Sequence, residues 1–206
     1  MDMKKLRRKM RRWIRKHRLF LILACAAALL AALLLMIPSE EPETTRDYEG
    51  FLNALGFRES SNRYDIVNRF GYMGRYQMGE LALQEAGMMD ADGAWTALAN
   101  SYGIYSREDF LDSPEVQDMA VRAYHKKTWA YIEWMELDAY VGSTYCGVTV
   151  TESGLLAACH LVGVGGVKRG LQNGQHVYDA NRVSAAEYME LFAGFDISGL
   201  WTEQEG

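Results

Sequence analysis

The chain of 206 residues is poor in the residue types that build metal, nucleotide and redox sites. Its four histidines are scattered, and no H-x-x-x-H spacing occurs. Its three cysteines contain no C-x-x-C pair, so the zinc and redox motifs built on that spacing are absent. The glycines from Gly163 to Gly166 lack the Lys-Ser/Thr pair of a phosphate-binding loop. We therefore expect neither a metal nor a cofactor.

Charge is divided unevenly along the chain. Residues 1–38 hold ten Lys or Arg and one acid, whereas the remaining 168 residues hold 12 bases and 26 acids. A basic N-terminus alone could indicate a nucleic-acid partner. The segment that follows it argues against this, and the acidic remainder is electrostatically unsuited to nucleic acid. We expect no nucleic-acid partner.

The sequence has a single long apolar run, which covers residues 19–37 and ends at Pro38. A helix of this length spans roughly the 30 Å of a bilayer core. The basic cluster before it, within residues 1–18, favours a cytoplasmic N-terminus. We predict a single-pass anchor in the cytoplasmic membrane. A cleaved signal peptide is the alternative, but the run is longer than a usual signal core and lacks a clear cleavage site.

The part of the chain after the anchor is expected to be extracytoplasmic. Residues 38–46 are polar, acidic and contain prolines, which predicts a linker. Residues 47–206 are then a single domain. Cys146 and Cys159 are its only cysteines, and either a disulfide or two buried thiols fits this compartment.

Helical patterning dominates this domain and predicts a mainly α fold. Apolar residues at Tyr48, Phe51, Leu52 and Leu55 follow the i, i+3, i+4, i+7 spacing of a helix. Capping and glycine signals predict further helices. The expected helices cover residues 45–59, 79–86, 113–137, 151–162 and 184–193. Residues 64–78 and 140–150 are expected to form short strands or extended loops.

Glu59 is the candidate catalytic residue. It is followed twelve residues later by a G-x-x-G-x-x-Q pattern made by Gly71, Gly74 and Gln77. Cleavage of a glycosidic bond requires a carboxylic acid that still holds its proton. The expected position at the C-terminal end of a helix disfavours a carboxylate charge. The alternative is a solvated glutamate at a helix end.

The residues around the two glycines fit a carbohydrate cleft. Gly71 and Gly74 would permit a tight turn or the close approach of a ligand. Gln77 has a donor and an acceptor for sugar hydroxyls or N-acetyl groups. The aromatic face of Tyr76 suits the apolar face of a sugar ring. Taken alone, this pattern also fits a loop before a polar helix.

Three sequence blocks together resemble the lytic transglycosylases of the soluble-lytic (SLT) type and the goose-type lysozymes. The blocks are Glu59-Ser60, the G-x-x-G-x-x-Q pattern, and L-L-A-A-C-H-L-V-G-V-G-G-V over residues 155–167. The resemblance implies a lysozyme-like fold that acts on the glycan strands of peptidoglycan. It implies that Glu59 is the catalytic acid and then the base. Ser60 and Gln77 would support the substrate, and residues 155–166 would line the cleft.

The third block departs from the family pattern, which reads roughly L-A-x-x-A-Y-N-A-G-x-G. Cys159-His160 stand in place of the Tyr-Asn pair, whose tyrosine usually contacts the catalytic carboxylate or the substrate. His160, Tyr140 or Tyr145 could take that role, and His160 could instead be a core histidine. A Cys159–His160 nucleophilic pair is not expected, because adjacent helical residues point about 100° apart.

The number of carboxylates distinguishes the two glycosidase outcomes. A hydrolase needs a second carboxylate, and the candidates Asp65, Asp90 and Glu152 lie in no second motif. A transglycosylase needs only one, because the muramic 6-hydroxyl attacks internally. The sequence therefore favours a membrane-anchored lytic transglycosylase, which could serve a machine that spans the cell envelope. A muramidase, a non-catalytic wall-binding scaffold and an anchored interaction protein with an unrelated helical bundle are the alternatives.

Overall fold

The computed structural model describes residues 45–202 together with five residues of the N-terminal segment: Met3, Met10, Trp13, Lys16 and His17. The chain divides into two compact units, Met1–Glu43 and Thr44–Gly206. In the first unit, the amide of His17 donates to the carbonyl of Trp13 at 3.0 Å, as in a helical turn. The expected anchor at residues 19–37 lies outside the described residues. Within the described part of the chain, no helix is long and apolar enough to cross a membrane.

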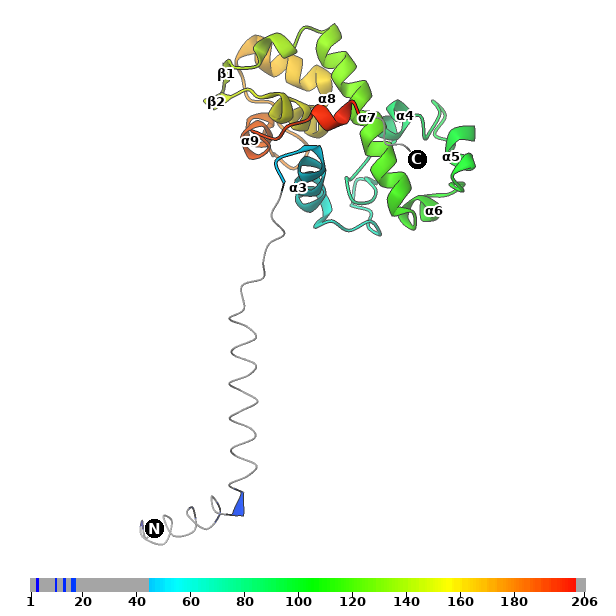
Figure 1. The fold of residues 1–206 in the computed structure, drawn as a ribbon, viewed down its shortest axis with the longest axis vertical. Helices are drawn as coiled ribbons and strands as arrows, with labels where there is room; N and C mark the ends of the chain where they lie inside the picture. The colour runs from blue at the N-terminus through cyan, green and yellow to red at the C-terminus, as the bar shows by residue number, and fades with distance from the viewer. Residues whose placement is uncertain (1–2, 4–9, 11–12, 14–15, 18–44, 203–206) are drawn as a thin grey trace. The chain divides into compact units, whose positions relative to one another are not determined.

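The second unit is mainly helical, as the apolar periodicity predicted (Figure 1). Its helices are α3 (Tyr48–Ser60), α4 (Glu80–Glu85), α5 (Ala97–Ser101), α6 (Arg107–Leu111), α7 (Pro114–Trp134), α8 (Glu152–Asn173) and α9 (Ala185–Leu191). Two 3-10 helices are η1 (Asp138–Tyr140) and η2 (Ser198–Leu200). Strands β1 (Thr144–Tyr145) and β2 (Val148–Thr149) form an antiparallel hairpin. In Figure 1, α4, α5 and α6 lie on one side of α7, whereas α8, α9 and the hairpin lie on the other.

Local capping explains where the two helices nearest the candidate site begin. Asp47 precedes α3 and accepts the amide of Gly50 at 2.8 Å. Ser184 and Glu187 form a capping box, with reciprocal bonds of 3.1 and 2.7 Å, at the start of α9, where the sequence predicts a helix from residue 184. Each cap satisfies amide groups that a helix start leaves without a partner. These caps fix both helix starts.

Two helices were not predicted from the sequence. Helices α5 and α6 have five residues each, which is too short for an apolar period to be recognised. Their N-cap residues, Thr96 and Ser106, do accept the expected amide hydrogen bonds at 3.2 and 3.1 Å. A capping residue that no apolar periodicity follows was not sufficient to predict a helix.

Helix α8 contains a break at Gly163. The sequence predicts that the helix ends at residue 162, and Gly163 indeed has non-helical angles of φ 71° and ψ 157°. A residue with a side chain rarely adopts this φ. The chain then resumes a helical path to Asn173, which the sequence did not predict.

The core joins helices that are distant in the sequence. Phe51, Leu55, Ile132, Leu156 and Phe192 all have no exposed surface, and they come from α3, α7, α8 and the end of α9. The rings of Phe51 and Phe192 meet edge to face at 5.5 Å between centroids. This packing holds α9 beside α3.

Candidate functional site

Glu59 is the penultimate residue of α3, as the apolar spacing predicted, and its side chain is half-buried. The phenolic hydroxyl of Tyr188 on α9 donates to its Oε1 at 2.6 Å. Its aromatic neighbours in the sequence, Phe57 and Phe70, are 66% and 47% exposed. The contact with the carboxyl group comes from α9, which is remote in the sequence.

Tyr188 is held in a single position by its surroundings. The residue is buried, its ring packs on Phe192 at 5.3 Å between centroids, and the Arg58 guanidinium lies 5.7 Å above the ring. Burial, and then the nearby charge of Glu59, raise the pKa of the Tyr188 hydroxyl far above its usual value. The hydroxyl therefore keeps its proton and acts as a permanent donor to Glu59.

The G-x-x-G-x-x-Q pattern forms a tight hairpin. Met73 and Met78 exchange backbone hydrogen bonds of 3.0 and 2.9 Å, which enclose residues 74–77. Gly74 has φ 71°, and a Cβ there would overlap the side chain of Gln117 on α7. Gln117 in turn accepts the amide of Arg75 at 2.9 Å. Gly74 is therefore required for packing against α7, in addition to any role at a ligand site.

Ser60 couples this hairpin to the end of α3. Its hydroxyl donates to the carbonyl of Arg75 at 2.8 Å and accepts the amide of Arg63 at 2.9 Å. The side chain is only 8% exposed. Ser60 therefore fixes the hairpin relative to Glu59, and this arrangement does not fit the direct substrate contact that the resemblance implied.

Arg75 fills the space between the hairpin, α3 and α7. Its guanidinium donates to Asn62 at 2.9 Å and to the Tyr64 hydroxyl at 2.8 Å, and it pairs with Asp118 at 3.3 Å. Tyr76 donates its hydroxyl to the same Asp118 at 2.8 Å. This polar cluster holds the hairpin rigidly on the helices.

Two tyrosines predicted as ligand contacts belong to the core. Tyr76 is 1% exposed, so a sugar cannot stack on its ring in this structure. Tyr145 is 4% exposed and donates to the carbonyl of Gln175 at 2.7 Å. Burial raises the pKa of Tyr145 to about 12. Both expectations relied on residue type, which does not report the face that a side chain presents.

Gln77 remains beside the turn of the hairpin. It has a left-handed φ of 46° and is half-buried. Its side-chain amide donates to the carbonyl of Gly74 at 2.8 Å. The amide group therefore closes the turn.

His160 belongs to a buried chain of hydrogen bonds. Its Nε2 lies 3.0 Å from the carbonyl of Tyr76, and its Nδ1 lies 3.3 Å from Nε2 of His125. Nδ1 of His125 is 3.0 Å from the Tyr48 hydroxyl. Because a carbonyl only accepts, Nε2 of His160 must donate to the carbonyl of Tyr76. Nδ1 of His160 then accepts from Nε2 of His125, and Nδ1 of His125 accepts from the Tyr48 hydroxyl. Two neutral imidazoles fit this chain.

His125 was not identified from the sequence, although it is the centre of this chain. It has no exposed surface, and burial lowers its pKa well below the usual 6.5, with further contributions from His160 and Arg122. His160 thus acts as a partly buried structural histidine that supports the hairpin backbone. Its two ring nitrogens lie within hydrogen-bond distance of His125 and of the Tyr76 carbonyl, and the contact with Glu59 comes from Tyr188.

The two cysteines of the domain are free thiols. Cys159 has no exposed surface, and burial raises the pKa of its thiol far above the usual value. A neutral buried thiol is a poor nucleophile. This agrees with the expectation that Cys159 and His160 form no catalytic pair.

The candidates for a second carboxylate are engaged elsewhere. Asp65 is exposed and pairs with Arg63 at 3.2 Å. Asp90 accepts the amides of Asp92 and Ala94 within its own loop, at 3.0 and 2.9 Å. Glu152 lies at the first position of α8 and lines a pocket that includes none of the predicted site residues. No group of three side chains in the described part of the chain is arranged to hold a metal ion.

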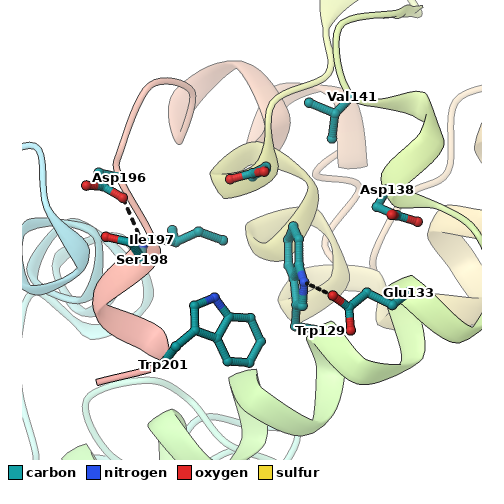
Figure 2. A pocket seen from close by; sticks show the side chains of 9 residues that line it. Trp129, Glu133, Asp138, Val141, Asp196, Ile197, Ser198 and Trp201 are labelled. Atoms are coloured by element: carbon teal, nitrogen blue, oxygen red, sulfur yellow. Dashed lines mark hydrogen bonds between the residues drawn. The ribbon is translucent and has the colours of Figure 1, made fainter. Parts of the chain in front are cut away.

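That pocket has a volume of about 420 Å³ (Figure 2). It is lined by Trp129, Glu133, Asp138, Val141, Glu152, Asp196, Ile197, Ser198 and Trp201. Its side chains come from α7, η1 and the residue after it, α8, the segment before η2, η2 itself and the residue after η2. It is therefore separate from the Glu59 site.

No protein family model, curated protein or solved structure matches this chain. The likeness to the SLT-type enzymes accordingly rests on the three sequence blocks. Of the residues in those blocks, Gln77 closes the turn of the hairpin, Ser60 and Gly74 fix the hairpin to α3 and α7, and His160 bonds the Tyr76 carbonyl within it. Glu59 directly precedes Ser60 on α3.

The most important residue that the sequence did not reveal is Tyr188. It directly follows the capping box of α9, a helix that the sequence predicts. A tyrosine on a short helix gives no sign of its partner when that partner is 129 residues away. Only the packing of α9 on α3 brings the two together.

Proposed function

We propose that the domain is a lysozyme-like lytic transglycosylase. It cleaves the β-1,4 bond between N-acetylmuramic acid and N-acetylglucosamine in peptidoglycan. The observation that carries this proposal is the half-buried carboxyl of Glu59, oriented by Tyr188 at 2.6 Å beside the G-x-x-G-x-x-Q hairpin. Helix α9 contacts that carboxyl group, and the hairpin is bonded to the next residue of α3, Ser60.

The reaction requires one group that gives and then takes a proton. Protonated Glu59 donates its proton to the glycosidic oxygen as the bond from that oxygen to C1 of the muramic residue breaks. The resulting carboxylate then removes the proton from the muramic 6-hydroxyl, whose oxygen bonds to C1. The products are a 1,6-anhydro-muramic end and a free N-acetylglucosamine hydroxyl, and Glu59 is protonated again.

Tyr188 supports both halves of this cycle. Its hydroxyl engages Oε1, so Oε2 is the oxygen that would exchange the proton with the substrate. A hydrogen bond from a neutral phenol also stabilises the carboxylate that exists between the two steps. The positions of Asp65, Asp90 and Glu152 favour internal attack by the 6-hydroxyl over a mechanism with a second carboxylate.

The proposed location follows from the anchor at residues 19–37. A single span would hold the domain outside the cytoplasmic membrane, where peptidoglycan lies. Its acidic surface is unsuited to electrostatic capture by an anionic wall. Recognition would therefore rely on hydrogen bonds and stacking, and an anchored enzyme of this size could open the wall for an envelope-spanning machine.

The decisive experiment is digestion of purified peptidoglycan by the full chain in detergent, with mass spectrometry of the products. Anhydro ends are one water lighter than the reducing ends that a muramidase makes. Glu59→Gln should abolish product formation, whereas Glu190→Gln, an exposed residue at the end of α9, should not. Unchanged cleavage by Glu59→Gln would refute the mechanism.

The same experiment separates the alternatives. Reducing ends made by the wild type would identify a muramidase. Co-sedimentation with peptidoglycan without any cleavage would identify a wall-binding scaffold, for which the altered Cys159-His160 block is the supporting observation. Neither cleavage nor co-sedimentation would point to an interaction protein.

A further inference from the structure

The pocket lined by Trp129 and Trp201 lies away from Glu59. Helix η2, which borders it, packs against Tyr48 at the first residue of α3: a Cβ on Gly199 would lie 3.1 Å from the Tyr48 Cβ. Glu59 is eleven residues further along the same helix, which is about 16 Å at 1.5 Å per residue. The pocket is therefore independent of the proposed glycan chemistry.

Two indole rings form part of its wall. Trp129 on α7 is 7% exposed, whereas Trp201 after η2 is 51% exposed. The ring centroids are 6.4 Å apart and the planes are inclined by 71° (Figure 2). The indole nitrogen of Trp129 donates to Glu133 at 3.1 Å, which fixes the ring and holds a carboxylate at its edge.

Four carboxylates also line the pocket, and no lysine or arginine does. They belong to Glu133, Asp138, Glu152 and Asp196. Figure 2 shows Asp196 on one side of the indoles, with Glu133 and Asp138 on the other. None of the four has an ion-pair partner within the described residues. The pocket therefore concentrates negative charge that the surrounding residues do not neutralise.

The spacing of these carboxylates excludes a simple metal site. Among the residues that the structure describes, no three acidic, histidine or cysteine side chains come close enough to hold one ion. A larger cation would instead contact the aromatic faces and the carboxylates at the same time. Tryptophan is the aromatic side chain that attracts organic cations most strongly.

We propose that this pocket binds the ammonium or guanidinium head of an organic cation. Its volume of about 420 Å³ lies within the range of small-ligand pockets. The indole rings would supply the cation–π contact, and the carboxylates would neutralise the charge of the bound head. The cation is either a free small molecule or a lysine or arginine side chain of a peptide, and both present the same chemistry.

Calorimetric titration of the full chain with matched pairs of probes tests this proposal. Choline is compared with 3,3-dimethylbutan-1-ol, which has nearly the same shape without the charge. Acetyl-Gly-Lys-Gly-amide is compared with the peptide that carries norleucine in place of lysine. We expect the charged member of at least one pair to bind about tenfold or more tighter than its neutral partner. The pair that responds identifies the source of the cation.

The chain provides a matched control for the aromatic contact. Trp201→Ala should weaken binding of the charged probe about fivefold or more. Because the Trp201 side chain is exposed, the variant should fold as the wild type does. Trp134→Ala removes a 76% exposed tryptophan on α7 that does not line the pocket, and it should leave binding unchanged. Glu133→Gln should also weaken binding, and added salt should do the same.

Two results would overturn the proposal. Equal affinity for the charged and neutral members of both pairs would show that the pocket recognises shape alone. The absence of any binding heat up to about 50 mM of each probe, well above the millimolar range of weak binding, would show that it is not a binding site. Because Glu59 is not involved, Glu59→Gln should bind the charged probe as the wild type does, whatever its effect on peptidoglycan.

Discussion

The hydroxyl of Tyr188 on α9 donates a hydrogen bond of 2.6 Å to Oε1 of Glu59 on α3, across 129 residues of sequence. In the family that the sequence resembles, a tyrosine of the third block usually contacts the catalytic carboxylate or the substrate. Here Cys159-His160 occupy that place in the sequence, and a tyrosine from α9 makes the contact with the glutamate. The tyrosine that contacts Glu59 therefore comes from another part of the sequence than the block on which the resemblance rests.

Replacement of Tyr188 by phenylalanine tests this contact. A hydrogen bond to a charged group contributes about 1.5–3 kcal/mol, so Tyr188→Phe should lower the kcat for peptidoglycan cleavage by about tenfold or more. The KM should change little, because the hydroxyl orients Glu59 and does not contact the glycan. Steady-state kinetics on purified peptidoglycan measures both constants.

Tyr178→Phe is the matched control for that variant. Tyr178 is 55% exposed, so the loss of its hydroxyl should leave the Glu59 carboxyl undisturbed and kcat within about twofold of the wild type. Equal kcat values for the two variants would contradict an orienting role for Tyr188.

The two glycines of the hairpin pattern should differ in their tolerance of alanine. Gly71 and Gly74 both have positive φ, 87° and 71°. A Cβ on Gly74 would also overlap the Gln117 side chain, whereas a Cβ on Gly71 would meet nothing within 4 Å. Gly71→Ala should cost about 1 kcal/mol of unfolding free energy, and Gly74→Ala about 2–4 kcal/mol. Urea unfolding measures both, and equal losses would contradict the packing role of Gly74.

The buried histidine chain should make stability depend on pH. His125 contacts Tyr48 and His160 and lies near Tyr124 and Arg122, and its pKa in the folded protein is well below 6.5. Unfolding therefore takes up a proton below about pH 6.5. The contribution of neutral, buried His125 to the free energy of unfolding is fully present above that pH. It decreases by about 1.4 kcal/mol per pH unit as the pH drops below it.

Urea unfolding between pH 7.5 and 5.5 measures this dependence. His125→Gln removes the titrating group, so the pH slope of the unfolding free energy should decrease by about one proton. The exposed His176 provides the control, because His176→Gln should retain the wild-type slope. A slope unaffected by His125→Gln would show that another group causes the pH dependence.

The buried thiol of Cys159 should resist alkylation in the folded protein. It has no exposed surface and its pKa is raised by burial. Cys146 is half-buried and is therefore more accessible. At pH 8, iodoacetamide should label Cys159 about a hundredfold more slowly than Cys146, and urea should remove the difference. Peptide mass mapping measures the two rates separately, and similar rates in the native state would contradict the burial of Cys159.

Apolar spacing and capping residues determined most of the local structure. The spacing of Tyr48, Phe51 and Leu55 placed Glu59 at a helix end, and Ser184 and Glu187 placed the start of α9. These signals act between residues three or four apart, so a single sequence reveals them. The same rule explains why α5 and α6 were not predicted, because these helices are too short to show an apolar period.

The sequence by itself therefore determined a mainly helical domain and the candidate acid Glu59. Tertiary structure decided the neighbours of that acid: Tyr188 contacts it, Ser60 and Gly74 pack the hairpin, and Tyr76 and Tyr145 are in the core. It also decided the assembly of Trp129 and Trp201 with four carboxylates around one pocket. The physical reason is that a hydrogen bond or a ring contact depends on distance in space. That distance is set by how whole helices pack, which a residue's type and its immediate neighbours do not specify.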